Sequence, residues 1–424
     1  MTGARFEAGE EFALAMDARD PLAHFRERFC FPNTKTNDDC IYLCGHSLGL
    51  QPKTASAYVE QGLRDWAQFG VEGHFHAENP WVPYHRLLTQ QTAALVGAQP
   101  AEVVVMNSLT VNLHLMMTSF YRPTAQRHKI LIERGAFPSD QYAVQSQIRF
   151  HGLEPESSLL ELTPRPGETC LRDEDVESLI DREGDSIALI LLGGVNYVTG
   201  QVFDMAGITK AGQRKGCVVG FDLAHAAGNI PLRMHDWGPD FAVWCSYKYL
   251  NGGPGCVGGC FVHERHAHAW GLPRFTGWWG HDEKTRFQMG STFNPMAGAE
   301  GWQLSNPPIL ALAALRASME IFAEAGMERL RAKSVLLTSY MEFLLKQQPL
   351  RNVSIITPRE EERRGAQLSI RAASQGRVLC DQLAKAGVIG DWREPDTFRV
   401  AAVPLYNSFH DVYRFVKRFS GAVH

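Results

Sequence analysis

The stretch CVVGFDLAHAAG, residues 217–228, places an acid directly after a short apolar run. The run 217–221 predicts a buried strand, so Asp222 would stand at its carboxyl end. Catalytic side chains gather at the carboxyl ends of the strands in a parallel sheet, which makes Asp222 a candidate functional residue. His225 follows within one turn. The alternative is that Asp222 caps the next helix and that His225 packs on the flank of that helix.

The next predicted strand, 241–245, runs into WCSYKYLNGGPG, residues 244–255. Lys248 lies at the end of this strand, among aromatic side chains and before a glycine-rich turn. An exposed loop lysine is the default interpretation, but partial burial would favour the neutral amine that Schiff-base chemistry with an aldehyde requires. Pyridoxal 5′-phosphate also needs an acid beside its pyridine nitrogen. Asp222 and Lys248 at neighbouring strand ends therefore predict a pyridoxal-phosphate site.

Apolar strands alternate with helical patterns on both sides of these two stretches. This alternation predicts an α/β domain with a mostly parallel sheet that is covered by helices on both faces. The further strand candidates are 103–106, 129–132, 187–192 and 257–262, and the helix candidates are 109–121, 138–150, 173–182 and 205–215.

After Pro308 the pattern changes. A long helical run is interrupted only by Gly326, and it predicts a helix that leads into a smaller α+β domain. The expected strands there are 354–356, 367–370 and 398–401, and the expected helices are 376–387 and 409–419.

Bulk composition excludes several classes of protein. A chain of 424 residues is too long for one small core. A net charge of −4 argues against nucleic acid as a main partner. No apolar run approaches the ~18 residues of a membrane span, and we expect no secretory signal at the acidic N-terminus. Nine cysteines, mostly in apolar segments, predict reduced thiols and a cytoplasmic protein.

Residues 253–258 spell G-x-G-x-x-G, which raises the possibility of a dinucleotide site. Such a motif must follow a strand and open a helix, whereas 257–262 predicts a strand and therefore a hairpin. A nicotinamide dehydrogenase is the rival interpretation from another class of enzyme. We expect the hairpin.

Two helix starts offer groups for the cofactor. Asn107-Ser108-Leu109-Thr110 follows the strand 103–106, and free N–H groups with a hydroxyl at a helix N-terminus can bind a phosphate. Ser108 or Thr110 as a plain N-cap fits equally well. Phe137 precedes Pro138 at the second helix start, where the phenyl ring would either stack on a planar cofactor or form a hydrophobic staple.

Two further groups have side chains that can bind a metal or an anion. His74 and His76 form an H-x-H pair, but no third ligand stands at a characteristic spacing, and we predict no metal site. Arg399 lies on a predicted strand of the smaller domain. Its guanidinium would either bind a substrate carboxylate in a two-bond fork or pair with a structural acid.

Taken together, the motifs of this chain resemble kynureninase over nearly its whole length. The matching stretches are GHSLGLQP (45–52), EGHFHA (72–77), NSLTVNLH (107–114), FPSDQYA (137–143), FDLAHAAGN (221–229), WCSYKYLNGGPG (244–255), GWWGH (277–281), LSNPPIL (304–310) and RVAAVPLYNSFHDVYRF (399–415).

The resemblance implies a fold-type-I pyridoxal-phosphate architecture with a mostly parallel seven-stranded sheet and a smaller C-terminal α+β domain. It divides the chain into an N-terminal helical arm that packs on the small domain (1–44), a large cofactor domain (45–310) and a small domain (311–424). It implies hydrolysis of the Cβ–Cγ bond of L-kynurenine or 3-hydroxy-L-kynurenine to an anthranilate and L-alanine, in tryptophan degradation and NAD biosynthesis.

The resemblance also assigns roles to residues. Lys248 would carry the cofactor as an internal aldimine, Asp222 would pair with the pyridine nitrogen, and Tyr247 would relay a proton. The rest of the cofactor pocket would be formed by Leu109, Thr110, Phe137, Pro138, Ser139, Asp140, His225, Trp278 and Asn306. The substrate would be bound by Arg399, His74, Ser47, Ser305 and Asn306.

Trp278 and Asn306 would come from the second subunit of a homodimer, as the resemblance implies. Polar groups such as His74 and Asn306 favour the hydroxylated substrate. His46 and Gly193 depart from the family pattern, which more often has Asn and in some members Ser at these places. An aminotransferase, a cysteine desulfurase or a non-catalytic binding protein on the same scaffold remains the alternative.

Overall fold

The computed structural model of the chain describes residues 5–33, 40–350, 352–372 and 376–423. Its larger part contains a seven-stranded sheet. The strands are β4 (Val103–Val105), β5 (Lys129–Glu133), β6 (Leu159–Leu162), β7 (Ile187–Gly193), β8 (Val218–Asp222), β9 (Phe241–Trp244) and β10 (Gly259–Val262). Their order is β4-β10-β9-β8-β7-β5-β6. Pairs from β9 to β6 are parallel, and β10 is antiparallel to both of its neighbours. The predicted mostly parallel seven-stranded sheet is confirmed.

Two details of this sheet differ from the sequence prediction. Strand β6 was not predicted because its four residues, LLEL, lie at the sheet edge and only the last is fully buried. Strand β8 extends to Asp222 itself, so this acid is the last residue of the strand rather than the first after it.

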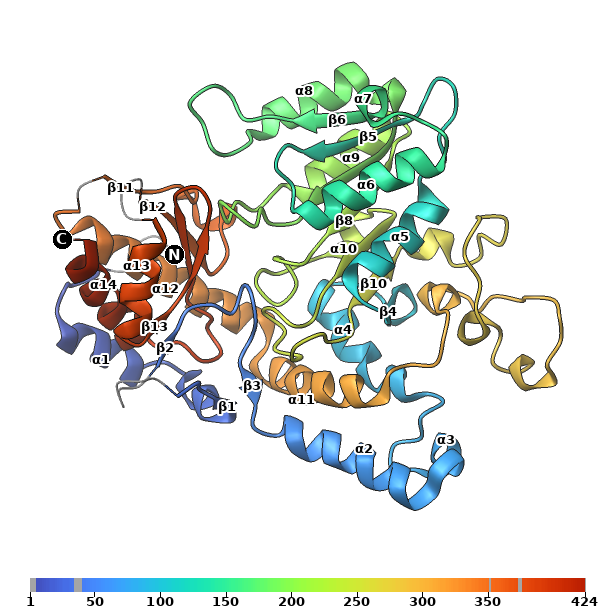
Figure 1. Cartoon of the computed structure of the whole chain (residues 1–424), viewed down its shortest axis with the longest axis horizontal. Helices are drawn as coiled ribbons and strands as arrows, with labels where there is room; N and C mark the ends of the chain where they lie inside the picture. The colour runs from blue at the N-terminus through green and yellow to red at the C-terminus, as the bar shows by residue number, and fades with distance from the viewer. Residues whose placement is uncertain (1–4, 34–39, 351, 373–375, 424) are drawn as a thin grey trace.

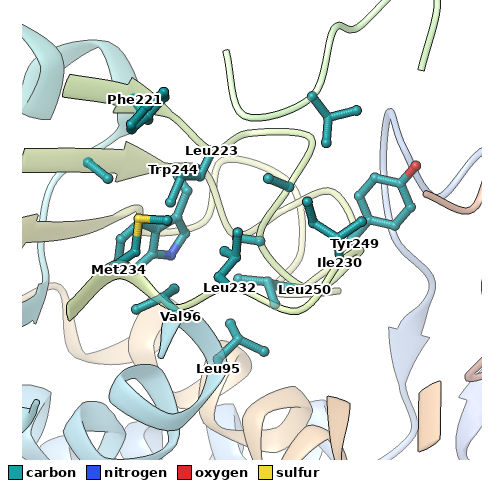
Figure 2. Packing of buried hydrophobic residues seen from close by; sticks show 14 of the residues in the cluster. Leu95, Val96, Phe221, Leu223, Ile230, Leu232, Met234, Trp244, Tyr249 and Leu250 are labelled. Atoms are coloured by element: carbon teal, nitrogen blue, oxygen red, sulfur yellow. The ribbon is translucent and has the colours of Figure 1, made fainter. Parts of the chain in front are cut away.

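Helices cover both faces of the sheet (Figure 1). The buried residues of β4 alternate, with Val104 in one core cluster and Val103 in the other. The face of the sheet that carries Val104 packs on α5 (Leu109–Phe120) and α6 (Pro138–Phe150). The opposite face packs on α4 (Thr89–Val96), α8 (Asp173–Glu183), α9 (Met205–Arg214) and α11 (Ile309–Ala325). Figure 2 shows part of the second cluster, where Val96 of α4 lies near Leu232, Met234 and Trp244.

The helical run after Pro308 is two helices, not one. Helix α11 ends at Ala325 and α12 (Met327–Lys346) begins after Gly326, whose φ of 76° is one that glycine adopts readily. Buried residues of α11 belong to the core of the large sheet, where α11 lies against α2 (Ala55–Phe69). Leu330 near the start of α12 still belongs to that core, whereas the buried apolar residues of α12 from Leu337 onward belong to a separate core. The domain boundaries stay a prediction, and this packing favours a change of core within α12.

The smaller part of the chain is built on a four-stranded antiparallel sheet in the order β11-β12-β15-β14. Its strands are β11 (Val353–Ile355), β12 (Gln367–Ala372), β14 (Asp391–Arg393) and β15 (Thr397–Ala401), and its helices are α12, α13 (Gly376–Lys385) and α14 (Phe409–Val423). The edge strand β14 was missed in the sequence because three residues with a charge at both ends give no apolar pattern.

The N-terminal segment lies against this smaller part (Figure 1). Helix α1 (Glu10–Ala18) packs on α14, where the Asp17 carboxylate accepts hydrogen bonds from the backbone N–H groups of Phe409 and His410. Strand β2 (Ile41–Tyr42) pairs with β13 (Val388–Ile389). Residues 1–4 and 34–39 of the predicted arm lie outside the described residues. Within the described ranges, no helix combines the length and the apolar character that crossing a membrane demands.

Candidate active site

A pocket opens where the carboxyl ends of β5, β7 and β8 meet the segment after β9. It is lined by Leu109, Thr110, Glu133, Phe137, Ser139, Asp140, Gly193, Val195, Tyr197, Asp222, Ala224, His225, Tyr247 and Lys248. We call these residues the active-site pocket. Nine of the residues assigned from the sequence are among them.

Lys248 extends into this pocket between two aromatic rings. Its Nζ lies 5.7 Å from the ring centre of Phe137 and 5.8 Å from that of Tyr247. The loop after it is held by close backbone packing, since a Cβ at Gly49 would lie 2.4 Å from the carbonyl oxygen of Lys248. A side chain at position 49 would therefore displace the lysine.

The glycine cluster after Lys248 forms the turn of a hairpin. Strands β9 and β10 are antiparallel neighbours, and Gly253 and Gly255 adopt positive φ values of 93° and 68°. No helix opens at this motif. The predicted hairpin is confirmed, and the structural context of a dinucleotide motif is missing at this place.

Asp222 is buried at the end of β8, and its Oδ1 accepts a hydrogen bond of 2.7 Å from the N–H of Ala224. The residues after it form turns and not a helix, so the helix-cap alternative is wrong. His225 is buried on the pocket wall, and its Nδ1 has no hydrogen-bond partner among the described residues. Burial and the charge of Lys248 hold the pKa of His225 well below its usual range, so the imidazole is neutral at pH 7.

Three carboxyl groups face the single amine in this pocket. Burial raises the pKa of Asp140 well above its usual range, and the negative charge of Asp222 adds to this effect. Burial also raises the pKa of Asp222, but Lys248 and the Ala224 N–H oppose the rise. Of the two acids, Asp140 is therefore the one that holds a proton more readily, and Asp222 is the one that more readily carries the charge. Burial raises the pKa of Glu133 to about 7.

Two helix N-termini open on the same pocket. Leu109 begins α5 and Ser108 is the N-cap residue of this helix by position, but its side chain makes no capping hydrogen bond. The Thr110 hydroxyl lies 2.7 Å from that of Ser139 in the first turn of α6, and the two hydroxyls join the helix starts. Unpaired N–H groups and hydroxyls at helix N-termini form a site for an anion such as a phosphate.

Five residues of the pocket were not assigned from the sequence, and two of them, Glu133 and Tyr197, carry polar groups. Glu133 ends strand β5, and an amide hydrogen bond of 2.8 Å from Asn196 Nδ2 holds its Oε2. An acid after an apolar run is the signal that identified Asp222, and it would also have identified Glu133. Tyr197 comes from the loop after β7, with its ring 5.3 Å from that of Phe137. A Cβ at Gly193 would lie 3.3 Å from Glu133 Oε1, so the glycine leaves room for this carboxyl group.

Several assigned residues lie outside the pocket of this single chain. Pro138 begins α6 but does not line the pocket. Trp278 is 43% exposed and packs against Phe287, with ring centres 5.5 Å apart. The segment that carries it projects from the body of the chain (Figure 1, yellow to orange). Ser305, Asn306 and His74 also lie away from the pocket, and the first two are exposed.

Arg399 lies behind Tyr197 in a group that we call the arginine cluster, which consists of Arg393, Arg399, Asp391, Ser47 and His46. Arg399 is 1% exposed and binds Asp391 in a fork, through Nε to Oδ1 at 2.8 Å and Nη2 to Oδ2 at 2.6 Å. Arg393 Nη2 donates to the same Oδ2 at 2.9 Å. The hydroxyl of Ser47 also donates to Oδ2, and Arg399 Nη2 lies 3.2 Å from its Oγ.

His46 completes the cluster as a neutral side chain. Burial and the charge of Arg399 lower the pKa of His46 to about 4. Its Nε2 lies 4.0 Å from Asp391 Oδ1. Burial raises the pKa of Asp391, but hydrogen bonds from its neighbours outweigh this and hold it well below the usual range.

The residues of the pocket fit pyridoxal phosphate. Lys248 provides an amine, Asp222 a buried acid, and the starts of α5 and α6 an anion site. Two buried polar atoms on the pocket wall, His225 Nδ1 and Asp140 Oδ1, lack partners among the described residues. Such atoms are costly unless a ligand or water satisfies them.

Comparisons with known proteins find relatives of one family. A family model described as the kynureninase C-terminal domain matches residues 330–419. A kynureninase of Koribacter versatilis is 68% identical over 99% of both chains, and one of Myxococcus xanthus is 61% identical over 98% of both.

Solved structures show the same fold at low identity. An apo cysteine desulfurase from Thermococcus onnurineus aligns with a TM-score of 0.76 at 16% identity, over 94% of this chain and 97% of the other. A variant of C-DES with glycine covalently linked to its pyridoxal-phosphate cofactor aligns with a TM-score of 0.75 at 17% identity, over 93% and 98%.

Proposed function

The chain belongs to the kynureninase family, and from this membership we propose that the active-site pocket cleaves L-kynurenine or 3-hydroxy-L-kynurenine. The bond broken joins Cβ and Cγ, water is consumed, and the products are an anthranilate and L-alanine. One observation carries the assignment to this pocket. An amine, a buried acid and two open helix N-termini face the same cavity.

Pyridoxal phosphate would be held by groups that this pocket gathers. Lys248 would bind it covalently, Asp222 would face the pyridine nitrogen, and Phe137 would lie against the ring. Its phosphate would accept hydrogen bonds at the starts of α5 and α6, from the backbone at Leu109 and the hydroxyls of Thr110 and Ser139. When bound, the cofactor supplies an aldehyde for imine formation and a ring that stores an electron pair.

The chain's own groups would move the protons of the reaction. Once its amine is free, Lys248 Nζ would accept the proton from the substrate Cα. Burial raises the pKa of Tyr247, so its hydroxyl stays protonated at neutral pH and can donate to Cβ as the bond breaks. Asp222 would keep its negative charge throughout, because Asp140 beside it holds the proton of the pair.

The substrate would contact a wider set of residues. Arg399 and Ser47 would bind the α-carboxylate. The aromatic end would lie near His74, Ser305 and Asn306, and we propose that Trp278 and Asn306 enter from the second subunit of a homodimer. The exposure of large apolar side chains on the projecting segment, such as Phe287 at 53% and Met289 at 75%, supports such a contact. A cytoplasmic location also stays a proposal, supported by nine free cysteines, all of them described.

Chemical labelling tests the central assignment. Borohydride reduction of the yellow protein should bleach it and leave the cofactor attached to the peptide that contains Lys248. The Lys248→Ala variant should lose turnover by roughly a thousandfold or more while its circular dichroism stays that of the wild type. Attachment at another lysine, or full activity of this variant, would refute the assignment.

The family membership leaves the substrate to be resolved. The ratio of kcat/KM for 3-hydroxykynurenine and kynurenine on one preparation tests the expected preference for the hydroxylated form, and a clear preference for kynurenine would reverse it. Cysteine desulfuration is not favoured. None of the nine cysteines, all of which are described, lines the active-site pocket.

A further inference from the structure

The guanidinium of Arg399 has almost no free donor. It carries five N–H groups. Nε and one N–H of Nη2 bind Asp391, the other N–H of Nη2 meets Ser47 Oγ, and Nη1 donates to the carbonyl oxygen of Tyr197 at 2.5 Å. One N–H of Nη1 remains. A substrate carboxylate can therefore form a two-bond fork with Arg399 only if one of these partners leaves.

Asp391 is the partner of Arg399 that can also bind a second guanidinium, that of Arg393. Arg393 and Asp391 are two residues apart on β14 and so lie on one face of the sheet, where Asp391 is directly across from Arg399 on β15 and Arg393 is across from Thr397. Arg393 donates only Nη2 to Asp391, at 2.9 Å. Its Nε is buried and has no hydrogen-bond partner among the described residues. A small rotation of the Asp391 side chain would give it a second fork, on Nε and Nη2 of Arg393.

The charges of the cluster favour the same exchange. Two guanidinium groups share one carboxylate, and His46 is neutral, so the cluster carries one surplus positive charge. One substrate carboxylate brings the total to zero, with one carboxylate for each arginine. Bidentate pairing of arginine with carboxylate is the strongest arrangement open to these groups.

The other two partners of Arg399 are fixed. The carbonyl of Tyr197 belongs to a loop that Gln367 Nε2 also holds, at 3.1 Å. The backbone of Ser47 is held by a hydrogen bond of 2.9 Å from its N–H to the carbonyl oxygen of Cys44, directly after the buried His46. Asp391 is the group whose departure leaves no buried charge without a partner, because Arg393 stays beside it.

We propose that Arg393 is a specificity-determining residue, which receives Asp391 when the α-carboxylate of the substrate takes the fork of Arg399. The exchange rests on the proposed function, and it deepens that function by explaining how the site selects amino acids over amines. In the free enzyme Asp391 occupies the fork as an internal carboxylate.

The two side chains of the exchange should act on KM in opposite directions. Asp391→Asn removes the competing carboxylate and should lower KM for L-kynurenine about tenfold, or about 1.4 kcal/mol. Arg393→Gln removes the place to which Asp391 moves and should raise KM by a similar factor. The kcat of both should stay within about threefold of the wild type, because neither group contacts the reacting atoms.

The double variant identifies the coupling. If Arg393 acts through Asp391, adding Arg393→Gln to Asp391→Asn should change KM by less than about twofold. A further rise in the double variant would mean that Arg393 binds the substrate directly, and a raised KM in Asp391→Asn alone would mean that Asp391 only orients Arg399. Either result overturns the exchange.

A second variant keeps the test independent of Asp391→Asn, should that protein fail to fold. Arg393→Lys keeps the charge but loses the fork, so KM should rise as in Arg393→Gln, and wild-type KM would overturn the proposal. Calorimetric binding of kynuramine, the amine that lacks the carboxylate, should be equal in all variants. Arg165→Gln, which breaks the exposed pair with Asp175, is the matched control and should leave KM unchanged.

The wild-type holoenzyme is measured first, so that two kinds of failure stay separate. Absence of kynurenine turnover refutes the proposed function, and calorimetric binding of L-alanine to the same variants then tests the exchange. Turnover with a wrong direction of the KM change refutes the exchange alone.

Discussion

Around Lys248 three carboxyl groups face one amine, whereas around Arg399 two guanidinium groups share one carboxylate. In the first group, Glu133 and Asp222 end strands of the large sheet and Asp140 lies in the first turn of α6, whereas the second group lies on one face of the small sheet. Tyr197 stands between them, because it lines the pocket while Arg399 lies 5.9 Å behind its ring.

The two groups match the two ends of one ligand. The carboxylate of Asp222 would stabilise a cationic pyridine ring, and the surplus guanidinium of the arginine cluster would stabilise a carboxylate. An amino acid joined to the cofactor would span both. The two groups also differ in the pKa of their carboxyl groups. Burial raises the pKa of Asp140 and of Glu133, whereas the arginine cluster holds the pKa of Asp391 low.

The largest effect should separate the two neighbouring acids of the pocket. Asp222→Asn removes a charge that faces the cofactor and should lower kcat/KM roughly 10²- to 10³-fold. Asp140→Asn replaces a carboxyl group that is already neutral and should cost less than about tenfold. Steady-state kinetics at saturating cofactor checks both, and equal losses would contradict the assigned protonation.

The arginine cluster should make the free energy of unfolding of the chain depend on pH in acid. The pKa of Asp391 is depressed in the folded chain, so its contribution is present above the unfolded pKa and is lost as the pH falls. Asp391→Asn should lower the free energy of unfolding by about 3 kcal/mol at pH 7 and reduce its fall below pH ~4. Urea unfolding measures this, with Asp175→Asn as the exposed control. If the free energy of unfolding of Asp391→Asn falls below pH ~4 as steeply as that of the wild type, Asp391 does not cause this pH dependence.

Glu133 should make the free energy of unfolding change with pH in the opposite direction. Its pKa of about 7 lies above its ordinary value of 4.5, so between these pH values the folded chain binds more protons than the unfolded one. Stability therefore falls as the pH rises, by on the order of 3 kcal/mol in total. In the cofactor-free protein, Glu133→Gln should reduce this fall of the free energy of unfolding with rising pH. Glu177→Gln, at an exposed position, should not. A wild-type slope in Glu133→Gln would mean that Glu133 titrates normally.

The smallest effect concerns the anion site. Thr110→Val removes a hydroxyl at the start of α5 and should weaken cofactor binding about tenfold. Thr118→Val on the same helix removes a hydroxyl that bonds only the helix backbone, to His114, and serves as the control. Equilibrium dialysis with pyridoxal phosphate measures both. Equal affinities would place the phosphate elsewhere.

The comparison also explains what the sequence can predict. Asp222 and Lys248 were found because each ends or follows an apolar strand, and the ends of parallel strands meet at one edge of a sheet. Asp391 was not found, since its role depends on the register between β14 and β15. A three-residue strand gives no pattern from which to read that register. Trp278 and Asn306 lie outside the pocket of one chain, so their roles stay predictions.

The link between the two halves of the chain has a consequence for how the family can vary. Arg399 and Gln367 both donate to the backbone carbonyl of Tyr197, and Ser369 donates to that of Val198. Backbone carbonyls are present whatever side chain the loop carries. Mutations can therefore accumulate in the loop without breaking this junction, and recombination that exchanges the C-terminal half between relatives should preserve it.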